Sequence, residues 1–566
     1  MTELNSVSEH KTAGLLSLPS ELILEIYAWA TLCHYNDANA TVGPPRGALL
    51  SQICRPLRRL ALSSQNLWDH VPRRSSPELT ELCLSRASTA PLHMDLHCHF
   101  DDSQDFAAKK LALPHLSRAR YLRLYVEFKF EYKTVNEALT LIYDALTSSP
   151  TPLLETFDVE FDTIDFADRN YSCIYLPQPL FHGAPPTQLN YLRLRQAGML
   201  RYPPPPTMPM SAFSSAVRSL NLHNSHLWGD VDEMVEFFMT IPLLEKLEYT
   251  LVSRDNRLFE ASPSRRHSPR CVRMDRLESF ITGELSIFNA SMAVFTYLAM
   301  PSRTQLILYL DREDDWGMDS ATHAYDSPYV ELGEQALREH FAAAVAAGEY
   351  YDHLHVDDVA HTISPQCPDD DDDDESLPDL HLRLLPPPHR LCLDIPVVRE
   401  ELKMQAYGMY LSLPIFTQVS QICVTGLCGD EVWDNLEPYK DVQTLVLYGD
   451  ALLSLVLHDL LPRGGRRFQL FPALRQIFIR NDDVSLRRLM HSTSEVMYEY
   501  TFHTYLVARR QIVTVYIERS SCKGAEELAG WLRARFRKEQ IVVYSMPESG
   551  SSSEGDDGED MQESQN

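Results

Sequence analysis

The stretch LNYLRL, from Leu189 to Leu194, gives the pattern that recurs most often along this chain of 566 residues. An apolar residue is followed three and five places later by two more, which is typical of a strand with one buried face. Nine stretches follow or approximate this spacing: LTELCL from Leu79, ARYLRL from Ala119, LLETFDV from Leu153, LNYLRL from Leu189, VRSLNL from Val217, LEKLEY from Leu244, VSQICV from Val419, VQTLVL from Val442 and LRQIFI from Leu474.

Stretches with the apolar spacing of helices lie between these strands, for example VNEALTLIYDAL from Val135 and VDEMVEFFMTI from Val231. A strand and a helix that recur at roughly 23 to 40 residues predict a repeat architecture. The pattern resembles leucine-rich repeats, and we predict an α/β chain with an irregular leucine-rich-repeat-like solenoid over residues 78–545. Residues 254–413 fit the period poorly, which predicts insertions there. An ordinary α/β domain is the alternative.

Composition indicates a folded chain outside the membrane. Apolar residues make up 44% of it, enough for a sizeable core. We find neither a secretory signal nor an apolar run of about 18 residues that could span a bilayer. Eleven cysteines without a CxxC pair predict reduced thiols, and therefore a cytoplasmic and/or nuclear location.

The negative charge is concentrated in two segments. The formal net charge is −28, and seven acidic residues lie in Asp369–Glu375 and seven more in the tail from Pro547. Such runs are usually solvated. We predict disorder in residues 1–14, 363–378 and 546–566. Basic residues form no continuous stripe, so we do not expect a nucleic-acid partner.

Catalytic motifs are missing from the sequence. It contains no GxGxxG, GxxxxGK[ST], GxSxG or HExxH. The histidine pairs in HCH (97–99) and HLH (353–355) lack a third ligand at metal-site spacing. We therefore predict that the chain is not an enzyme and uses neither cofactor nor metal, with an enzyme of unrecognised residues as the alternative. SRRHSPR, from Ser264, offers serines for phosphorylation, but a plain exposed loop is the default interpretation.

Two short apolar helices precede the repeats. LPSELILEIY, from Leu18, carries apolar residues at helical spacing, and ICRPLRRLALSSQNLW, from Ile53, carries a second set in which Pro56 should kink or divide the helix. Two such helices are too small to enclose a core by themselves. They therefore need a partner or a neighbouring domain, and capping the end of the solenoid is one alternative.

These two stretches closely resemble the F-box, the helical module by which substrate receptors dock on the Skp-type adaptor of cullin-RING ubiquitin ligases. The likeness spans residues 15–72. It departs from the family pattern at Leu57, where a tryptophan is usual, and in the long loop 34–47. The resemblance implies these adaptor-binding residues: Leu18, Pro19, Leu22, Ile23, Ile26, Ile53, Cys54, Leu57, Leu60, Leu67 and Trp68.

An F-box followed by degenerate leucine-rich repeats implies a fungal-type substrate-recognition subunit of an SCF-type ligase. Its partners would be a Skp-type adaptor, through it a cullin, and an unknown protein substrate marked for ubiquitin-dependent degradation. A repeat scaffold that is not linked to ubiquitination is the alternative. The F-box face that we expect to be exposed is led by Leu18, Pro19, Leu22, Ile26, Leu57 and Leu60.

The polar positions of the strands should face away from the core, where they can bind a substrate. They give these candidates: Tyr121, Arg123, Tyr191, Arg193, Arg195, Asn221, His223, Tyr448, Phe478 and Arg480, with Tyr125 beside them. Arginine and tyrosine often anchor interfaces, and arginine pairs with carboxylate or phosphate. We therefore expect an acidic or phosphorylated protein segment to bind there. The alternative is that these are ordinary solvent-facing strand residues.

Overall fold

The structure is a computed structural model of the whole chain. It describes the residues 17–35, 46–71, 76–98, 103–128, 136–163, 174–177, 179–198, 213–225, 227–251, 259–282, 288–308, 328–357, 362–365, 391–394, 400–426, 428–460, 470–480, 513–519, 522, 525–534, 537 and 540–545. The segments predicted to be disordered at 1–14 and 546–566 lie outside these residues, as does 366–378. Ile363 lies within a strand, β15 (Thr362–Ser364), so the prediction of disorder from residue 363 is wrong at its start.

The chain divides into an N-terminal unit, Met1–Pro301, and a C-terminal unit, Ser302–Asn566. The main sheet of the N-terminal unit contains β1 (His70–Val71), β2 (Leu92–Cys98), β3 (Ala119–Phe128), β4 (Thr156–Thr163), β6 (Tyr191–Arg195), β8 (Ser219–His223), β9 (Lys246–Thr250) and β11 (Ser279–Thr282). Each strand pairs in parallel with the one that precedes it in this series. Strand order in this sheet therefore follows chain order.

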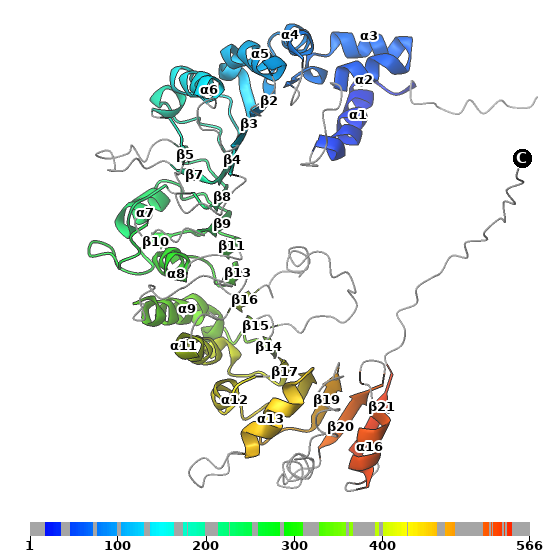
Figure 1. Cartoon of the computed structure of the whole chain (residues 1–566), viewed down its shortest axis with the longest axis vertical. Helices are drawn as coiled ribbons and strands as arrows, with labels where there is room; N and C mark the ends of the chain where they lie inside the picture. The colour runs from blue at the N-terminus through cyan, green and yellow to red at the C-terminus, as the bar shows by residue number, and fades with distance from the viewer. Residues whose placement is uncertain are drawn as a thin grey trace, which may run out of the picture. The chain divides into compact units, whose positions relative to one another are not determined.

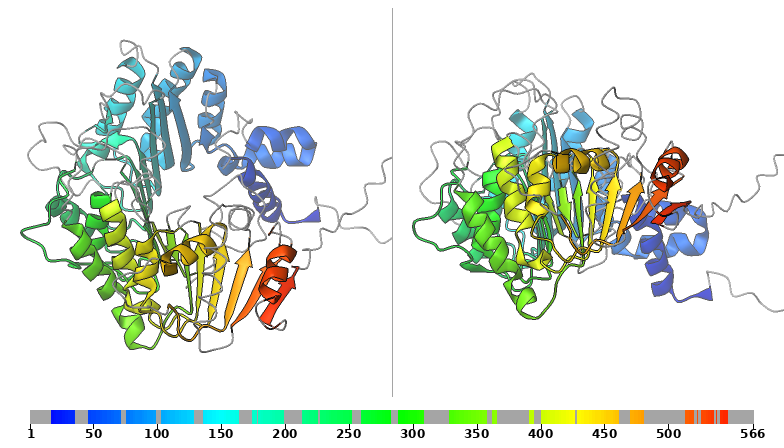
Figure 2. Two further views of the ribbon diagram at one scale, coloured as in Figure 1. Left: turned by 60° about the horizontal axis from the view of Figure 1, so that its bottom comes forward. Right: turned by 90° about the horizontal axis from the view of Figure 1, so that it is seen from below.

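The C-terminal unit begins irregularly and then becomes regular. Its strands are β13 (Gln305–Leu308), β14 (His353–Asp357), β15, β16 (Leu391–Asp394), β17 (Gln421–Thr425), β18 (Thr444–Tyr448), β19 (Gln476–Arg480), β20 (Thr514–Glu518) and β21 (Ile541–Tyr544). Strand β15 pairs antiparallel with β14 and β16, while β13 is parallel to β16. From β14 through β17 to β21 the pairing is parallel and sequential, and the arrows in Figure 2 point the same way.

Helices connect the strands and cover one side of each sheet (Figure 1). They are α4 (Pro77–Arg86), α5 (Ser103–Ala112), α6 (Asn136–Ser148), α7 (Val231–Met239) and α8 (Phe288–Tyr297), then α9 (Tyr329–Ala346), α11 (Glu400–Leu411), α12 (Asp430–Leu436), α13 (Ala451–Leu460) and α16 (Ala525–Arg533). Crossovers between parallel strands are right-handed, so a sheet that grows in one direction places successive helices on the same side. The chain is therefore a mixed α/β protein with mostly parallel sheets.

The repeated apolar spacing has a direct structural cause. The backbone N–H of Leu189 donates to the carbonyl of Pro186 at 3.2 Å, which closes a turn just before β6. Leu192 and Leu194 then point from β6 into the core, and all three leucines are fully buried. The residue after a strand often takes a left-handed conformation: Asn224 has φ 47° and Gly449 has φ 56°. The same turn, strand and left-handed exit recur in both units.

Eight of the nine predicted strands are confirmed, in β3, β4, β6, β8, β9, β17, β18 and β19. The prediction for LTELCL, from Leu79, is wrong, because this stretch lies in α4. Ser76 caps that helix by accepting a hydrogen bond from the N–H of Leu79 at 3.2 Å, and Pro77 occupies its first turn. The predicted helices from Val135 and Val231 are confirmed as α6 and α7.

Three helices precede β1: α1 (Ser20–Tyr35), α2 (Arg46–Ile53) and α3 (Arg55–Ser63). The predicted break at Pro56 is confirmed, since α2 ends at Ile53 and Pro56 lies in the first turn of α3. Trp68 packs between these two helices, and its indole Nε1 donates to the carbonyl of Ala61 at 2.8 Å. Leu50, Leu57 and Leu67 are also buried. The helical module, residues 17–35 and 46–71, thus has a small core of its own.

Candidate functional site

The N-terminal unit carries a polar surface on the side of its sheet that faces away from the buried leucines. We call it the polar face. Its residues form three rows in register across neighbouring strands: His93, Tyr121, Thr156, Tyr191 and Ser219; Asp95, Arg123, Asp158, Arg193, Asn221 and Glu248; and His97, Tyr125, Glu160, Arg195 and His223. Strictly parallel, in-register pairing places one residue of each strand beside its counterpart on the next.

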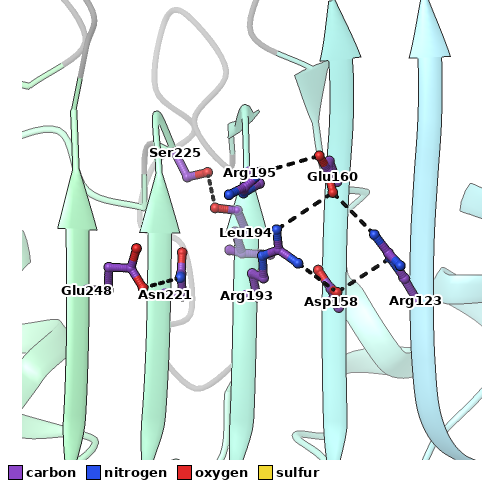
Figure 3. A network of polar contacts seen from close by, with 9 residues as sticks. All are labelled: Arg123, Asp158, Glu160, Arg193, Leu194, Arg195, Asn221, Ser225 and Glu248. Atoms are coloured by element: carbon purple, nitrogen blue, oxygen red, sulfur yellow. Dashed lines mark hydrogen bonds and ion pairs between the residues drawn. The ribbon is translucent and has the colours of Figure 1, made fainter. Parts of the chain in front are cut away.

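Opposite charges alternate across the central strands of the polar face (Figure 3). Asp158 Oδ2, on β4, lies 3.6 Å from Arg123 Nε on β3 and 3.3 Å from Arg193 Nη1 on β6. Glu160 Oε2 contacts the same two arginines at 3.5 and 3.8 Å. Its other oxygen, Oε1, lies 3.5 Å from Arg195 Nη1. Two carboxylates of one strand therefore bind three guanidinium groups of the flanking strands.

Asp158 is the least exposed member of this network, with 6% of its side chain accessible. Burial raises the pKa of its carboxyl group and outweighs the lowering by Arg193 and Arg123. Its Oδ1 atom is buried and has no hydrogen-bond partner among the residues that the structure describes. On the far side of Arg193, Asn221 Nδ2 donates to Glu248 Oε2 at 2.5 Å and extends the polar contacts to β9.

Two histidines of the polar face, His223 and His93, have lowered pKa values and are neutral at pH 7. Burial, with smaller effects of Arg195 and Arg193, lowers the pKa of His223 to about 4. Burial likewise lowers the pKa of His93 to about 4, with a smaller effect of Arg46. These imidazoles therefore contribute ring area and hydrogen bonds, but no positive charge, to this surface.

Most residues of the first row carry a ring, but the residue contributed by β4 does not. The rings of His70 and His93 are 6.3 Å apart, and His93 stacks on Tyr121 with centroids 5.6 Å apart and planes at 11°. The next strand offers only Thr156, which is partly exposed, before the row resumes with Tyr191. A small side chain thus interrupts a row of rings beside the carboxylate network.

The C-terminal unit carries an aromatic cluster at the corresponding side of β18 to β21. Phe478 stacks on Tyr516 with centroids 4.5 Å apart and planes at 8°. Arg480 Nε donates to the hydroxyl of Tyr544 and Nη1 to that of Tyr448, both at 3.0 Å. The guanidinium carbon lies 5.9 Å from the centre of the Tyr448 ring. Ring stacking and hydrogen bonds to the arginine therefore connect the side chains of this cluster.

The predicted substrate-binding residues therefore fall into two groups. The structure brings together Tyr121, Arg123, Tyr125, Tyr191, Arg193, Arg195, Asn221 and His223 on the polar face, and Tyr448, Phe478 and Arg480 in the C-terminal cluster. Each group belongs to its own unit.

Sequence reasoning missed the carboxylates that organise the polar face. Asp158 and Glu160 occupy, on β4, the positions that Arg123 and Tyr125 occupy on β3. The signal lies in the stretch from Leu153, because Asp158 and Glu160 occupy outward positions of the strand that it predicts. Aligning the repeats by their buried leucines would have placed Asp158 between Arg123 and Arg193.

In the helical module, some of the predicted adaptor-binding residues are exposed and the others are buried. Leu22, Ile26 and Ile53 are 45%, 47% and 63% exposed, and Leu18 is 38% exposed. Pro19 is exposed too, while Cys54 and Leu60 are partly exposed. These side chains leave apolar area accessible on α1 and α2.

The other predicted adaptor contacts are internal: Ile23, Leu57, Leu67 and Trp68 are all less than a tenth exposed. The prediction that Leu57 lies on the exposed face is wrong. Leu57 faces the core that α2, α3 and Trp68 enclose, because a short helical hairpin must bury its few large side chains to be stable. These four residues hold the module together instead of lining its surface.

The histidine pairs noted in the sequence have structural partners. His97 packs against Tyr125 with ring centroids 4.3 Å apart, and His355 Nε2 lies 2.9 Å from the hydroxyl of Thr425. Among the described residues, no three His, Cys, Asp or Glu side chains are grouped as metal ligands would be. Within the same part of the chain, no helix has the length and apolar character needed to cross a bilayer.

Comparison with known proteins adds no relative. The sequence matches no protein-family model, and it matches no curated protein. Function must therefore be argued from the residues themselves.

Proposed function

We propose that this chain is the substrate-recognition subunit of an SCF-type cullin-RING ubiquitin ligase. Residues 15–72 would act as the F-box that docks on a Skp-type adaptor, and the repeats would bind a protein substrate. The observation that carries the proposal is the helical module, which has a closed core around Trp68 and still exposes Leu22, Ile26 and Ile53.

The exposed residues fit a docking surface better than a solenoid cap. A cap turns its apolar side chains towards the repeats and its polar side chains towards water. Leu22 and Ile26 are four residues apart, so they lie on one side of α1, and Leu18 lies just before the helix. All three are more than a third exposed. Apolar side chains arranged in this way are typical of a helix that binds a partner.

The test is adaptor binding by the full chain. Replacing Leu22 and Ile26 with alanine should weaken the complex by about 2 kcal/mol or more, roughly 30-fold in Kd, because two large apolar contacts are lost. The change is confined to exposed positions, so folding should be retained. Binding of a purified Skp-type adaptor would be measured by calorimetry.

Leu82→Ala is the matched control, because Leu82 is 40% exposed on α4, outside the helical module. It should bind the adaptor as the wild type does. Equal affinity of the Leu22→Ala, Ile26→Ala variant and the wild type would refute the docking surface.

Strand order supports the proposed leucine-rich-repeat-like solenoid. A doubly wound sheet reverses its strand order and carries helices on both faces. In the N-terminal unit the order from β1 to β11 runs in one direction, and the connecting helices cover one side of the sheet (Figure 1). A surface of many short parallel strands is well suited to an extended protein ligand.

The polar face favours a different substrate from the acidic one expected from the sequence. Arg123, Arg193 and Arg195 already contact Asp158 or Glu160, so a phosphate would have to displace these carboxylates. We propose instead a segment of balanced charge, with one side chain placed over Thr156 between Tyr121 and Tyr191. Tyrosine at such positions supplies large contact area at low entropic cost.

Catalysis by the chain itself is not part of the proposal. A receptor accelerates ubiquitin transfer by holding the substrate near the charged conjugating enzyme, which raises the effective concentration of the two reactants. Such a protein would work in the cytoplasm and/or nucleus. A repeat scaffold without a ligase partner is the second candidate, and the buried position of Leu57, where the F-box pattern has tryptophan, favours it.

A further inference from the structure

The segment 259–271 of the N-terminal unit contains three serines in different surroundings. It reads FEASPSRRHSPRC and includes two Ser-Pro pairs, at Ser262 and Ser268. It packs on α7, on the helix-covered side of the sheet (Figure 1). Its chemistry is independent of both the adaptor surface and the polar face.

Ser264 is the internal anchor of this segment. Its hydroxyl donates to Asp232 of α7 and accepts hydrogen bonds from the backbone N–H groups of Arg266 and His267, at 3.0 and 2.7 Å. Its own N–H donates to the hydroxyl of Tyr297 at 2.8 Å. Modification of this oxygen would break the turn that it organises.

Arg270 anchors the other end. It has a left-handed backbone with φ 58°, and its N–H donates to the carbonyl of Thr296 at 2.9 Å. Its guanidinium lies 5.7 Å from the centre of the Phe295 ring and donates to the carbonyl of Leu298 at 2.5 Å. The residues between Ser264 and Arg270 are therefore held at both ends.

Ser268 lies between these anchors and is exposed, outside any helix or strand. Its hydroxyl has no hydrogen-bond partner among the residues that the structure describes. Because proline follows it, the α conformation is disfavoured and the backbone is biased to an extended form. Arg265 and Arg266 precede it and Arg270 follows in the sequence. Arg266 is already ion-paired with Asp232 and Glu236 of α7, at 2.8 and 3.1 Å, whereas Arg265 makes no ion pair among the described residues.

Ser262 is also followed by proline, but its hydroxyl contacts an acidic side chain. Its hydroxyl donates to the carboxylate of Glu260 at 3.2 Å. A phosphate on Ser262 would therefore lie beside a negative charge, whereas Ser268 has Arg265 and Arg270 within three residues of it in the sequence and contacts no carboxylate among the described residues.

We propose that Ser268 is a phosphorylation site for a proline-directed serine kinase. The kinase transfers the γ-phosphoryl group of ATP: the bond between the γ-phosphorus and the β–γ bridging oxygen breaks, and a bond from the Ser268 Oγ to phosphorus forms. The hydroxyl proton passes to the kinase base, and ADP leaves. The product carries a dianion three residues along the chain from Arg265, on the helix side of the N-terminal unit.

The test compares the full chain with the free peptide 258–273. A proline-directed kinase is chosen because it modifies both Ser262 and Ser268 in the peptide, and sites are quantified by mass spectrometry. In the full chain, the ratio of phosphate on Ser268 to that on Ser262 should rise at least tenfold over the peptide. Ser268→Ala should remove most incorporation, and Ser262→Ala should remove little. A ratio equal to or below that of the peptide would overturn the proposal.

Discussion

Gly47→Ala tests the packing that closes the helical module. Gly47 lies in the first turn of α2 against the indole of Trp68. A Cβ atom there would lie 2.3 Å from Trp68 Cε2 and 2.5 Å from Nε1, distances that carbon atoms do not tolerate. The ring is 3% exposed and is held by the hydrogen bond from Nε1 to Ala61, so it must move as a whole.

The expected cost follows from these contacts. Forcing a ring out of a packed site costs about 1–3 kcal/mol, and leaving a buried indole N–H without its acceptor costs about 1–3 kcal/mol. Alanine recovers at most about 1 kcal/mol of helix propensity. These terms add to about 1–5 kcal/mol, and we expect the substitution to destabilise the pairing of α2 and α3 by about 2–4 kcal/mol, in the middle of that range.

Hydrogen–deuterium exchange of the full chain measures this locally. A loss of 2–4 kcal/mol should speed exchange of the α2 and α3 amides by roughly 30- to 1000-fold if they exchange through opening of the module. Gly530→Ala is the matched control: Gly530 is exposed in α16, and a Cβ there meets nothing within 4 Å.

The same chemical change at Gly530 should stabilise α16 by about 0.5–1 kcal/mol. The two variants are thus expected to differ in sign. If Gly47→Ala left exchange in α2 and α3 unchanged or slowed it, the packing of Trp68 described above would be wrong.

Two further predictions concern the polar face. Arg193→Glu would place a third carboxylate beside Asp158 and Glu160, so it should lower the free energy of unfolding, measured in urea, by about 2–4 kcal/mol. Arg276→Glu, at an exposed site, is the control and should change that free energy by less than about 0.5 kcal/mol. Similar effects of the two substitutions would contradict the ion-pair network. Acidification from pH 7 to 5 should destabilise the N-terminal unit. The pKa of His223 is lowered to about 4 from its usual 6.5, so between these pH values the unfolded chain binds more protons than the folded chain. The stability present above pH 6.5 is therefore lost as the pH falls towards 4. His223→Gln should flatten that dependence by up to about 1.4 kcal/mol per pH unit, and an unchanged slope would exclude His223 as its source.

The regular part of the fold could be predicted from the sequence because its cause is local. An apolar residue that closes a turn, followed by two inward apolar residues, suffices to define β6 or β18. LTELCL carries the same letters, yet Ser76 and Pro77 before it favour a helix start. The distinction depends on the residues preceding the pattern, which the pattern itself does not include.

The candidate site could be predicted only in part, because its chemistry depends on pairing between strands. The sequence placed Arg123 and Arg193 on one face, and the structure agrees. Their state depends on Asp158, which lies on the strand between them. Likewise, amphipathic spacing identified the helices of the module, but which of Leu57 and Ile53 faces inward depends on how α2 and α3 fold against each other and against Trp68.

Sequential strand order in the N-terminal unit bears on how the chain is made. Each strand from β2 to β11 has its neighbour already synthesised when it leaves the ribosome, since its partner is the preceding strand of the sheet. Contacts between neighbours in sequence close short loops and form rapidly. The growing edge can therefore serve as the template for each new strand, so that this unit can assemble vectorially, from β1 towards β11, before translation of the chain has finished.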